Sequence, residues 1–387
     1  MNQRNAAIDI FRALTMALMV FVNDLWTILD APTWMEHTAT LTDGMGLADV
    51  VFPMFLFAMG MSVPYALEKR MAGGKPLGET LVHILERTFA LLVMGVFIYN
   101  SERGPAMNKG VYWLVMLLGF GLVWNSYPEG FKARKWLKAA GVVILAVLAI
   151  VFRTKDGDLM RTGWWGILGL IGWAYLFTSS AYLLCRRKPW ILALLLAVLC
   201  LVNLSVVPMR TGEPWIGRNV LADFSDALHI GNGHTAILAL GGALTVLCGQ
   251  RIGKGKLAVG LAAAAVLAIL GMLFHQDWII SKNIGTLPWC LFVGAISVAL
   301  YTLLRALEQK GWTGWARPLS PAGTATLTMY MVPYIFYALR LFARQAWNLD
   351  TPAWLTGYVG VGKCILFVAL CIAVTWALGK MKIKLKI

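Results

Sequence analysis

Charged residues are scarce in this sequence. Only 14% of its 387 residues are Asp, Glu, Lys or Arg, whereas 59% are hydrophobic and the mean hydropathy is +0.69. An ordinary globular domain carries roughly 25% charged residues. The apolar residues come in blocks of about 20, the length of a membrane-spanning helix, and the alternating segments of about ten residues that a barrel needs are absent. The composition therefore predicts an all-α, polytopic integral membrane helical bundle.

Several common motifs are also missing. The six cysteines lie in or at the ends of apolar blocks, without a C-x-x-C pair or a histidine at ligand spacing, so no metal site is predicted. No glycine-rich loop of Walker or Rossmann form is present, which argues against ATP or NAD. The first apolar block contains Asp9 and Arg12 and is not followed by an A-x-A site, so we expect it to be retained rather than cleaved as a signal peptide.

The apolar blocks predict about 12 transmembrane helices in one domain over residues 1–387. They lie near 7–28, 47–67, 81–100, 111–127, 136–152, 164–184, 190–207, 234–250, 257–274, 285–304, 319–343 and 353–379. One alternative leaves the hairpin 111–127 and 136–152 outside the membrane. Without it ten spans would remain, and every later loop would keep its side of the membrane.

Lys and Arg concentrate in alternate loops, which places both termini in the cytoplasm by the positive-inside rule. The net charge of +15 then reflects topology and contact with anionic headgroups, and nucleic-acid binding has no support. Most acidic residues and His37, His229, His234 and His275 fall outside, so we expect chemistry on the extracytoplasmic face. The basic residues of the predicted inside loops are Arg4, Lys69, Arg70, Lys75, Lys132, Arg134, Lys135, Lys138, Arg186, Arg187, Lys188, Arg251, Lys254, Lys256, Arg305, Lys310, Arg317, Lys380, Lys382, Lys384 and Lys386.

The segment 23–60 gathers many ionisable groups between two apolar runs. It contains no Lys or Arg, and its acids and single histidine are Asp24, Asp30, Glu36, His37, Asp43 and Asp49. An acidic loop with one imidazole, held between hydrophobic helices, favours proton-transfer chemistry. The alternative is a solvated acidic connector.

Asp9 and Arg12 stand three residues apart in the first span, and hence on one face of a helix. They either neutralise each other near the membrane interface or mark a ligand path inside the bundle. Asn23 sits at the outer end of the same helix, where its amide can cap, pack or hold a substrate.

Several stretches of the sequence carry a family resemblance. The pattern IDIFRALTMALMVFVN, an acidic loop with W-M-E-H, and DGMGLADVVFPMFLFAMGMSV resemble the first two core helices of the heparan-α-glucosaminide N-acetyltransferase family and its bacterial relatives. Three later stretches are also similar to that family: WWGILGLIGWAYL (164–176), SKNIGTLPWCLFVGA (281–295) and LSPAGTATLTMYMVPYI (319–335).

The resemblance implies a membrane acyltransferase that takes an acetyl group from cytoplasmic acetyl-CoA and delivers it to an extracytoplasmic sugar or glycan amine or hydroxyl. The family's functional Asn and His match Asn23 and His37, and the acid of its D-V-V-F-P motif matches Asp49. The expected setting is a bacterial inner membrane, with the bilayer, acyl-CoA and the acceptor as partners and a homodimer as one possible assembly.

The chemistry of the residues agrees with these roles. His37 is suited to act as general base and Asn23 to donate hydrogen bonds to an oxyanion, while Asp49 either orients His37 or caps the second helix. His37 alternatively only ties down its loop.

Acyl-CoA is expected to contact Arg12, Asp9, Lys282 and Asn283. The simpler role for Lys282 is that of an interfacial lysine, and for Trp289 that of an interface anchor. His234, at the start of the eighth span, is either a capping-region residue or a partner behind the site.

Two other functional classes remain open. A secondary transporter suits a bundle with intramembrane Asp9 and Arg12, and an inactive scaffold or glycan-export partner is the third class.

Overall fold

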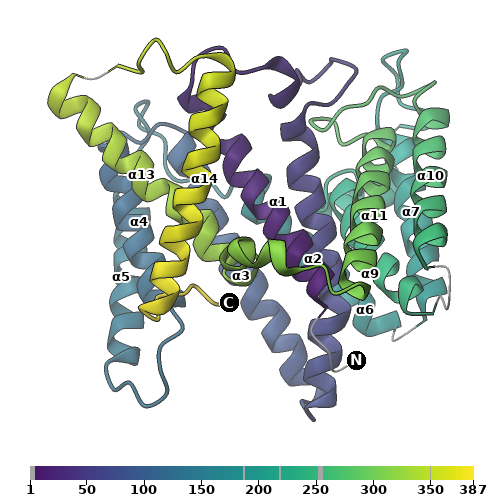
Figure 1. Cartoon of the computed structure of the whole chain (residues 1–387), viewed down its shortest axis with the longest axis horizontal. Helices are drawn as coiled ribbons and strands as arrows, with labels where there is room; N and C mark the ends of the chain where they lie inside the picture. Colours follow the sequence, from purple (N-terminus) through teal and green to yellow (C-terminus); the bar gives the residue numbers. More distant parts are fainter. Residues whose placement is uncertain (1–4, 186–187, 218, 252–255, 349) are drawn as a thin grey trace. The chain divides into compact units, whose positions relative to one another are not determined.

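A computed structural model describes residues 5–185, 188–217, 219–251, 256–348 and 350–387. Arg4, Arg186, Arg187 and Lys254, which belong to the predicted inside loops, lie outside these ranges. Helices occupy each apolar block that the sequence predicts to span the membrane, so the all-α bundle is confirmed (Figure 1).

The contacts divide the chain into two compact units. Unit 1 comprises Met1–Thr15, Pro32–Thr88 and Leu170–Arg317, and unit 2 comprises Met16–Ala31, Phe89–Gly169 and Pro318–Ile387. Helices α1 (Ala6–Asp24), α3 (Leu77–Glu102), α6 (Ile167–Cys185) and η3 (Gly314–Leu319) each contribute residues to both. That the whole chain acts as one domain stays a prediction.

Unit 1 is built around helix α2, which packs closely against α9, while α10 packs on α11. A Cβ atom added at Gly60 of α2 would strike the carbonyl oxygen of Ala239, and one at Gly242 of α9 would strike that of Phe57. Small residues of this kind allow two membrane helices to approach backbone to backbone. The elements that lie wholly in unit 1 are η2 (Thr33–Met35), α2 (Leu47–Ala72), α7 (Pro189–Val206), α8 (Val220–Ala227), α9 (His234–Arg251), α10 (Lys256–Phe274) and α11 (Leu287–Gln309).

Unit 2 is organised around helix α13, which packs against α4, α12 and α14, while α5 packs on α4. Figure 1 shows α13 passing beside α4 and α14. Its elements are η1 (Leu25–Thr27), α4 (Lys109–Trp124), α5 (Arg134–Val151), α12 (Ser320–Thr324), α13 (Thr326–Trp347) and α14 (Gly357–Lys380).

Within the described residues, nine helices are long and apolar enough to cross a membrane, and α4 and the apolar part of α9 are shorter. The protein is therefore a multi-pass membrane protein. Helix α5 is not among the nine, so insertion of the α4–α5 hairpin stays a prediction, as does the cytoplasmic location of both termini.

Candidate active site

The first turn of helix α2 positions Asp49. Gly46 precedes the helix, and the Asp49 Oδ2 atom accepts a hydrogen bond from the Gly46 amide at 3.1 Å. A carboxylate here also faces the positive end of the helix dipole. The same oxygen accepts from the Thr38 amide and the Thr38 hydroxyl, each at 3.0 Å. Capping therefore uses one oxygen of Asp49 and leaves the other, Oδ1, for a different partner.

The backbone of Asp49 is held by an unusual contact. Pro53 has no N–H to offer the carbonyl four residues earlier, which is that of Asp49. The indole of Trp289 donates to this carbonyl instead, at 3.0 Å. Trp289 is only 1% exposed, so its expected role as an interface anchor is wrong. A buried donor was needed here because a carbonyl without a partner is costly inside a membrane protein.

His37 contacts the second oxygen of Asp49. The distance from His37 Nδ1 to Asp49 Oδ1 is 2.6 Å, and the Asp49 side chain is 0% exposed whereas that of His37 is 53% exposed. A buried carboxylate bound at Nδ1 fixes the proton on that nitrogen and leaves the Nε2 lone pair to accept another. Of the two roles expected for Asp49, capping and orienting His37, the geometry supports both at once.

Lys282 completes this cluster from the loop between α10 and α11. Its Nζ atom lies 3.1 Å from His37 Nδ1, 3.4 Å from His37 Nε2 and 3.8 Å from Asp49 Oδ1. Since Nδ1 donates to Asp49, the ammonium acts as a neighbouring charge rather than as a second donor to that atom. Burial lowers the pKa of Lys282, and the Asp49 carboxylate opposes this shift.

Two loops are joined by hydrogen bonds beside the cluster. The Asn283 amide donates to the Thr38 carbonyl at 3.1 Å, and the Ser281 hydroxyl donates to the Thr40 carbonyl at 3.0 Å. The Gly44 amide donates to the Ile280 carbonyl at 2.9 Å. Asn283 therefore fixes the backbone next to His37, which is a different task from the acyl-CoA contact expected of it.

A second ion cluster joins the same pair of loops to Arg210, in the loop between α7 and α8. Asp43 contacts Arg210 at 2.6 Å and His275 at 2.9 Å, and it accepts from the Ile280 amide at 2.8 Å. Burial alone would raise the pKa of Asp43, but these hydrogen bonds outweigh it and hold that pKa below its usual value. The sequence placed Asp43 and His275 on the outer side, but it offered no spacing signal that would pair residues so far apart in the chain.

Not all predicted site residues meet at this cluster. Asp9 and Arg12 pair with each other, with Arg12 Nη2 3.0 Å from Asp9 Oδ1. They lie near the end of unit 1 where Asn5 contacts Tyr65, about 24 Å along α2 from Asp49 at 1.5 Å per residue. Asn23 belongs to unit 2, where its carbonyl accepts from the Tyr337 hydroxyl at 3.4 Å.

His234 begins α9, and its ring meets Trp289 edge-on with the ring centroids 6.1 Å apart. It therefore lies behind the Asp49 backbone. Among the described residues, no group of three or more His, Cys, Asp or Glu side chains could hold a metal ion.

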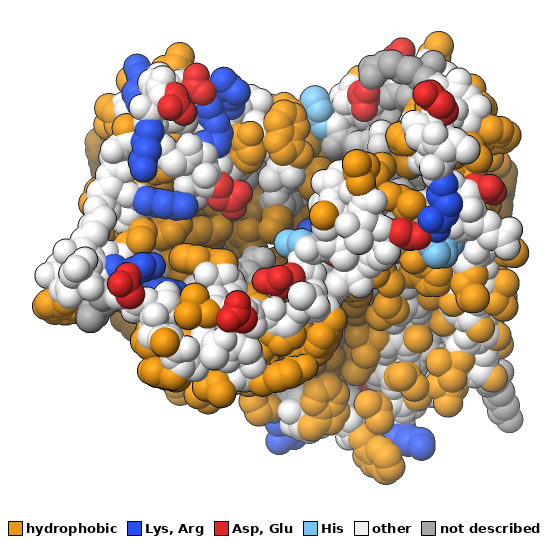
Figure 2. All heavy atoms as spheres, turned by 90° about the horizontal axis from the view of Figure 1, so that it is seen from above, with side chains coloured by type: hydrophobic (Ala, Val, Ile, Leu, Met, Phe, Trp, Pro, Cys, Tyr) orange, Lys and Arg blue, Asp and Glu red, His pale blue; other side chains and the backbone are white. Residues whose placement is uncertain are grey.

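Charged side chains gather on the face drawn in Figure 2, where acidic, basic and histidine side chains are visible among hydrophobic ones. The aspartate, imidazole and lysine cluster lies at the end of unit 1 where helix α2 begins.

The family follows from comparison with known proteins. The profile described as "Domain of unknown function (DUF5009)" matches residues 4–229, which is more than half of the chain, so the chain belongs to this family. The matched region includes residues 23–60, and therefore His37 and Asp49.

The resemblance to heparan-α-glucosaminide N-acetyltransferase is confirmed as a distant and partial similarity. The mouse protein is 34% identical over 144 residues, which is 33% of this chain and 20% of that protein. The human protein is 33% identical over 103 residues, 26% of this chain and 14% of that protein. The similarity thus spans a small part of these relatives.

Proposed function

We propose that the protein is a membrane acyltransferase, which moves an acetyl or similar acyl group from acyl-CoA to an amine or hydroxyl of a sugar or glycan. The observation that carries this proposal is the 2.6 Å contact between His37 Nδ1 and the buried Asp49 carboxylate. The partial similarity to N-acetyltransferases supports the reaction class.

His37 acts as the general base in this proposal. Its Nε2 atom removes the proton from the acceptor amine or hydroxyl as the acceptor attacks the thioester carbonyl carbon. The new C–N or C–O bond forms, the C–S bond breaks, and the departing CoA thiolate takes up one proton. Asp49 holds the ring and stabilises the imidazolium that forms between these steps.

Lys282 supplies positive charge at the same place. Its ammonium lies within 3.4 Å of both ring nitrogens of His37 and is held against the Asp49 carboxylate. We assign it the task of stabilising the negative charge that develops on the carbonyl oxygen. This role differs from the acyl-CoA contact expected of Lys282 from the sequence. Arg12, at the other end of unit 1, remains the candidate for the CoA phosphates, with Asp9 as its ion-pair partner.

Asn23 stays a candidate oxyanion donor on the ground of the family pattern alone. Replacing it by Ala is expected to slow transfer by about 10²–10³-fold if its amide donates to the oxyanion. Rates of transfer by the purified Asn23→Ala variant measure this role separately from that of His37.

The decisive experiment is His37→Ala in the full chain, assayed with acetyl-CoA and amino-sugar or hydroxyl acceptors. Transfer should fall about 10²-fold or more, the scale of a lost general base. CoA-dependent thermal stabilisation should remain, because the half-exposed imidazole is not expected to hold the nucleotide.

His275→Ala is the matched control, since His275 is also an outer histidine paired with an aspartate. It should retain most of the activity. Transfer by His37→Ala at the wild-type rate would refute the assignment.

A transporter is the competing function, and one observation favours it. Asp24 and Lys363 form an ion pair within two candidate membrane spans, with Lys363 Nζ 2.6 Å from Asp24 Oδ2. Intramembrane pairs of this kind often mark solute or proton paths. A protein that ignores acyl-CoA in thermal-shift assays but takes up a solute in proteoliposomes would support this alternative.

A further inference from the structure

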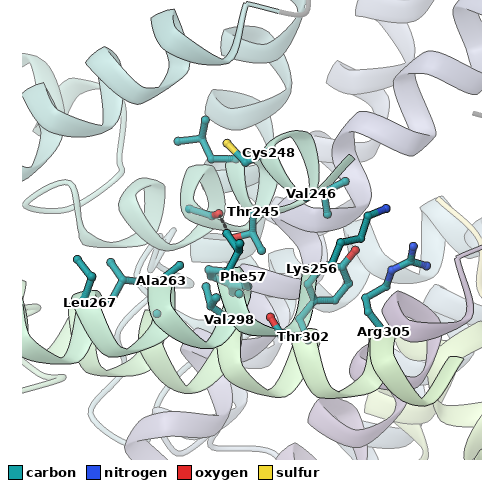
Figure 3. A pocket seen from close by; sticks show the side chains of 18 of the residues that line it. Phe57, Thr245, Val246, Cys248, Lys256, Ala263, Leu267, Val298, Thr302 and Arg305 are labelled. Carbon is teal, nitrogen blue, oxygen red and sulfur yellow. Dashed lines mark hydrogen bonds between the residues drawn. The ribbon is translucent and has the colours of Figure 1, made fainter. Parts of the chain in front are cut away.

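Unit 1 contains a cavity that the proposed chemistry does not use. It has a volume of about 660 Å³ and is lined by residues of α2, α7, α9, α10 and α11. This volume falls within the usual range of small-molecule sites, roughly 300–1,000 Å³. Figure 3 shows Phe57, Val298, Ala263 and Leu267 among its lining side chains.

The cavity has one polar end. Lys256 and Arg305 line it together with Gln250 and Gln309, and Figure 3 shows the nitrogen atoms of Lys256 and Arg305 at the same end, away from Ala263 and Leu267. Elsewhere the lining is mainly aliphatic, and the hydroxyl of Thr245 already donates to the Gly241 carbonyl at 2.8 Å. Such a cavity matches an amphiphile that has an anionic head and a hydrocarbon tail.

Charge at the polar end favours an anion. Arg305 pairs with Glu308, whose other carboxylate oxygen accepts from the Ala6 amide at 2.7 Å. Lys256 lies at the first position of α10, where the positive end of the helix dipole adds to its own charge. With one carboxylate against two cations, the end of the cavity keeps a net positive charge.

The position of the cavity connects it to the bilayer. Helix α10 packs chiefly on α11, and its other side exposes large apolar residues such as Ile269, Met272 and Leu273. In a membrane this side of α10 faces lipid. From Lys256 to Leu267 the lined part of α10 is about 16 Å long at 1.5 Å per residue. That is about half of the hydrocarbon core of roughly 30 Å, the depth of one leaflet.

From these observations we propose that the cavity is a specific site for one anionic phospholipid. Its phosphate pairs with Lys256 and Arg305, and one of its acyl chains occupies the apolar part of the cavity. The polar end of this site, at Arg305, lies about 24 Å along α11 from Trp289 at 1.5 Å per residue. The inference stands whether or not the protein transfers acyl groups.

Native mass spectrometry of the full chain released from detergent tests this site with phosphatidylglycerol and phosphatidylcholine as probes. We expect a one-to-one adduct with phosphatidylglycerol, at least tenfold tighter than with phosphatidylcholine. The double variant Lys256→Gln with Arg305→Gln should abolish this preference. Lys310→Gln is the matched control, because Lys310 is an exposed lysine that follows α11 and does not line the cavity.

A second variant blocks the space for the lipid acyl chain and leaves the charges of Lys256 and Arg305 unchanged. A Cβ atom at Gly294 would meet only Leu267, at 3.8 Å, so Gly294→Leu extends into the cavity and should weaken the phosphatidylglycerol adduct about tenfold while the protein melts normally. Glycerol phosphate should not compete, because the tail supplies much of the binding.

Three results would overturn the proposal. Equal binding of both lipids or an undisturbed adduct in the variants would remove the specific site. Competition by glycerol phosphate would indicate an anion site without a lipid. Displacement of phosphatidylglycerol by long-chain acyl-CoA at equal concentration, with the same dependence on Lys256 and Arg305, would assign the cavity to acyl-CoA instead.

Discussion

Asp24 in unit 2 and Asp49 in unit 1 are both fully buried, yet they occupy opposite ends of their helices. Asp49 stands in the first turn of α2, where the helix dipole favours a negative charge, and Asp24 is the last residue of α1, where the dipole opposes it. Asp24 contacts a lysine ammonium at 2.6 Å, whereas Asp49 contacts an imidazole that is 53% exposed. This difference in partners suggests that Asp24 serves stability and Asp49 serves the proposed reaction.

The partners explain this separation. Lys363 pairs with Asp24 and also donates to the Thr27 hydroxyl at 2.7 Å, so both of these partners of the ammonium come from the protein itself. The Oδ2 atom of Asp49 accepts hydrogen bonds from two backbone amides and a hydroxyl, and its Oδ1 atom is left to orient His37. We therefore expect changes at Asp24 to affect stability and changes at Asp49 to affect turnover.

The largest expected effect is on folding. Asp24→Asn leaves Lys363 partly buried without its charge partner, which should lower the free energy of unfolding by about 3–5 kcal/mol. The measurement is chemical unfolding in detergent micelles. Adding Lys363→Met should recover much of the loss, because the remaining buried charge is removed with its partner. A double variant as unstable as Asp24→Asn would show that the pair is not the cause.

The next effect is on turnover. Asp49→Asn should slow acyl transfer by about 10²-fold or more, because the amide no longer fixes the imidazole proton on Nδ1. Combining it with His37→Ala should add little to the loss from His37→Ala alone, since the two residues act as a unit. Multiplied losses in the double variant, measured as kcat/KM, would contradict this coupling.

Lys282 gives a smaller and pH-dependent effect. Because its pKa is lowered from the ordinary value near 10.4, Lys282 loses its proton at a lower pH than a free lysine does. If its charge assists transfer, kcat/KM should decline on the alkaline side at a pH below 10.4. Lys282→Arg should move this decline upward, because arginine keeps its charge.

The control for Lys282 is a neutral replacement. Lys282→Met should lower kcat/KM on the order of tenfold and remove the alkaline decline. Identical pH profiles for the wild type and Lys282→Met would exclude the ammonium from the reaction.

The smallest effect concerns the loop that carries His37. Asp43→Asn should destabilise the protein by about 1 kcal/mol, since Asp43 is partly exposed and its ion pairs are screened. The pKa of Asp43 is lower when folded, so its contribution is present above the unfolded pKa of about 3.9 and is lost as pH falls through the folded value.

Thermal unfolding between pH 3 and pH 7 measures this effect. The difference between wild type and Asp43→Asn should shrink as the pH drops below about 4. Asp277→Asn is the control, because Asp277 is an exposed acid of the neighbouring loop. A difference that persists unchanged to pH 3 would contradict the role of the Asp43 charge.

Hydropathy made the helices predictable from the sequence, because a lipid environment demands apolar blocks of a set length. The pairing of His37 with Asp49 could also be predicted, because the two residues lie close in sequence on either side of the start of α2. The contact of Asp43 with Arg210 and His275 could not be predicted, because it depends on how loops that are distant in the sequence pack together. The role of Trp289 was predicted wrongly. Its hydrogen bond to the Asp49 carbonyl, which Pro53 leaves without a helical donor, depends on the packing of α11 against α2, and the sequence does not show that packing.

That carbonyl also sets the order in which the site can form during synthesis. Helix α2 is made early, but the indole that satisfies Asp49 and the ammonium beside His37 both belong to residues 282–289. A growing chain that has released only α1 to α10 from the ribosome therefore holds His37 and Asp49 without Trp289 or Lys282. The proposed reactive centre is therefore completed late in translation. A chain that ends before residue 281 should insert into the membrane and show no acyl transfer.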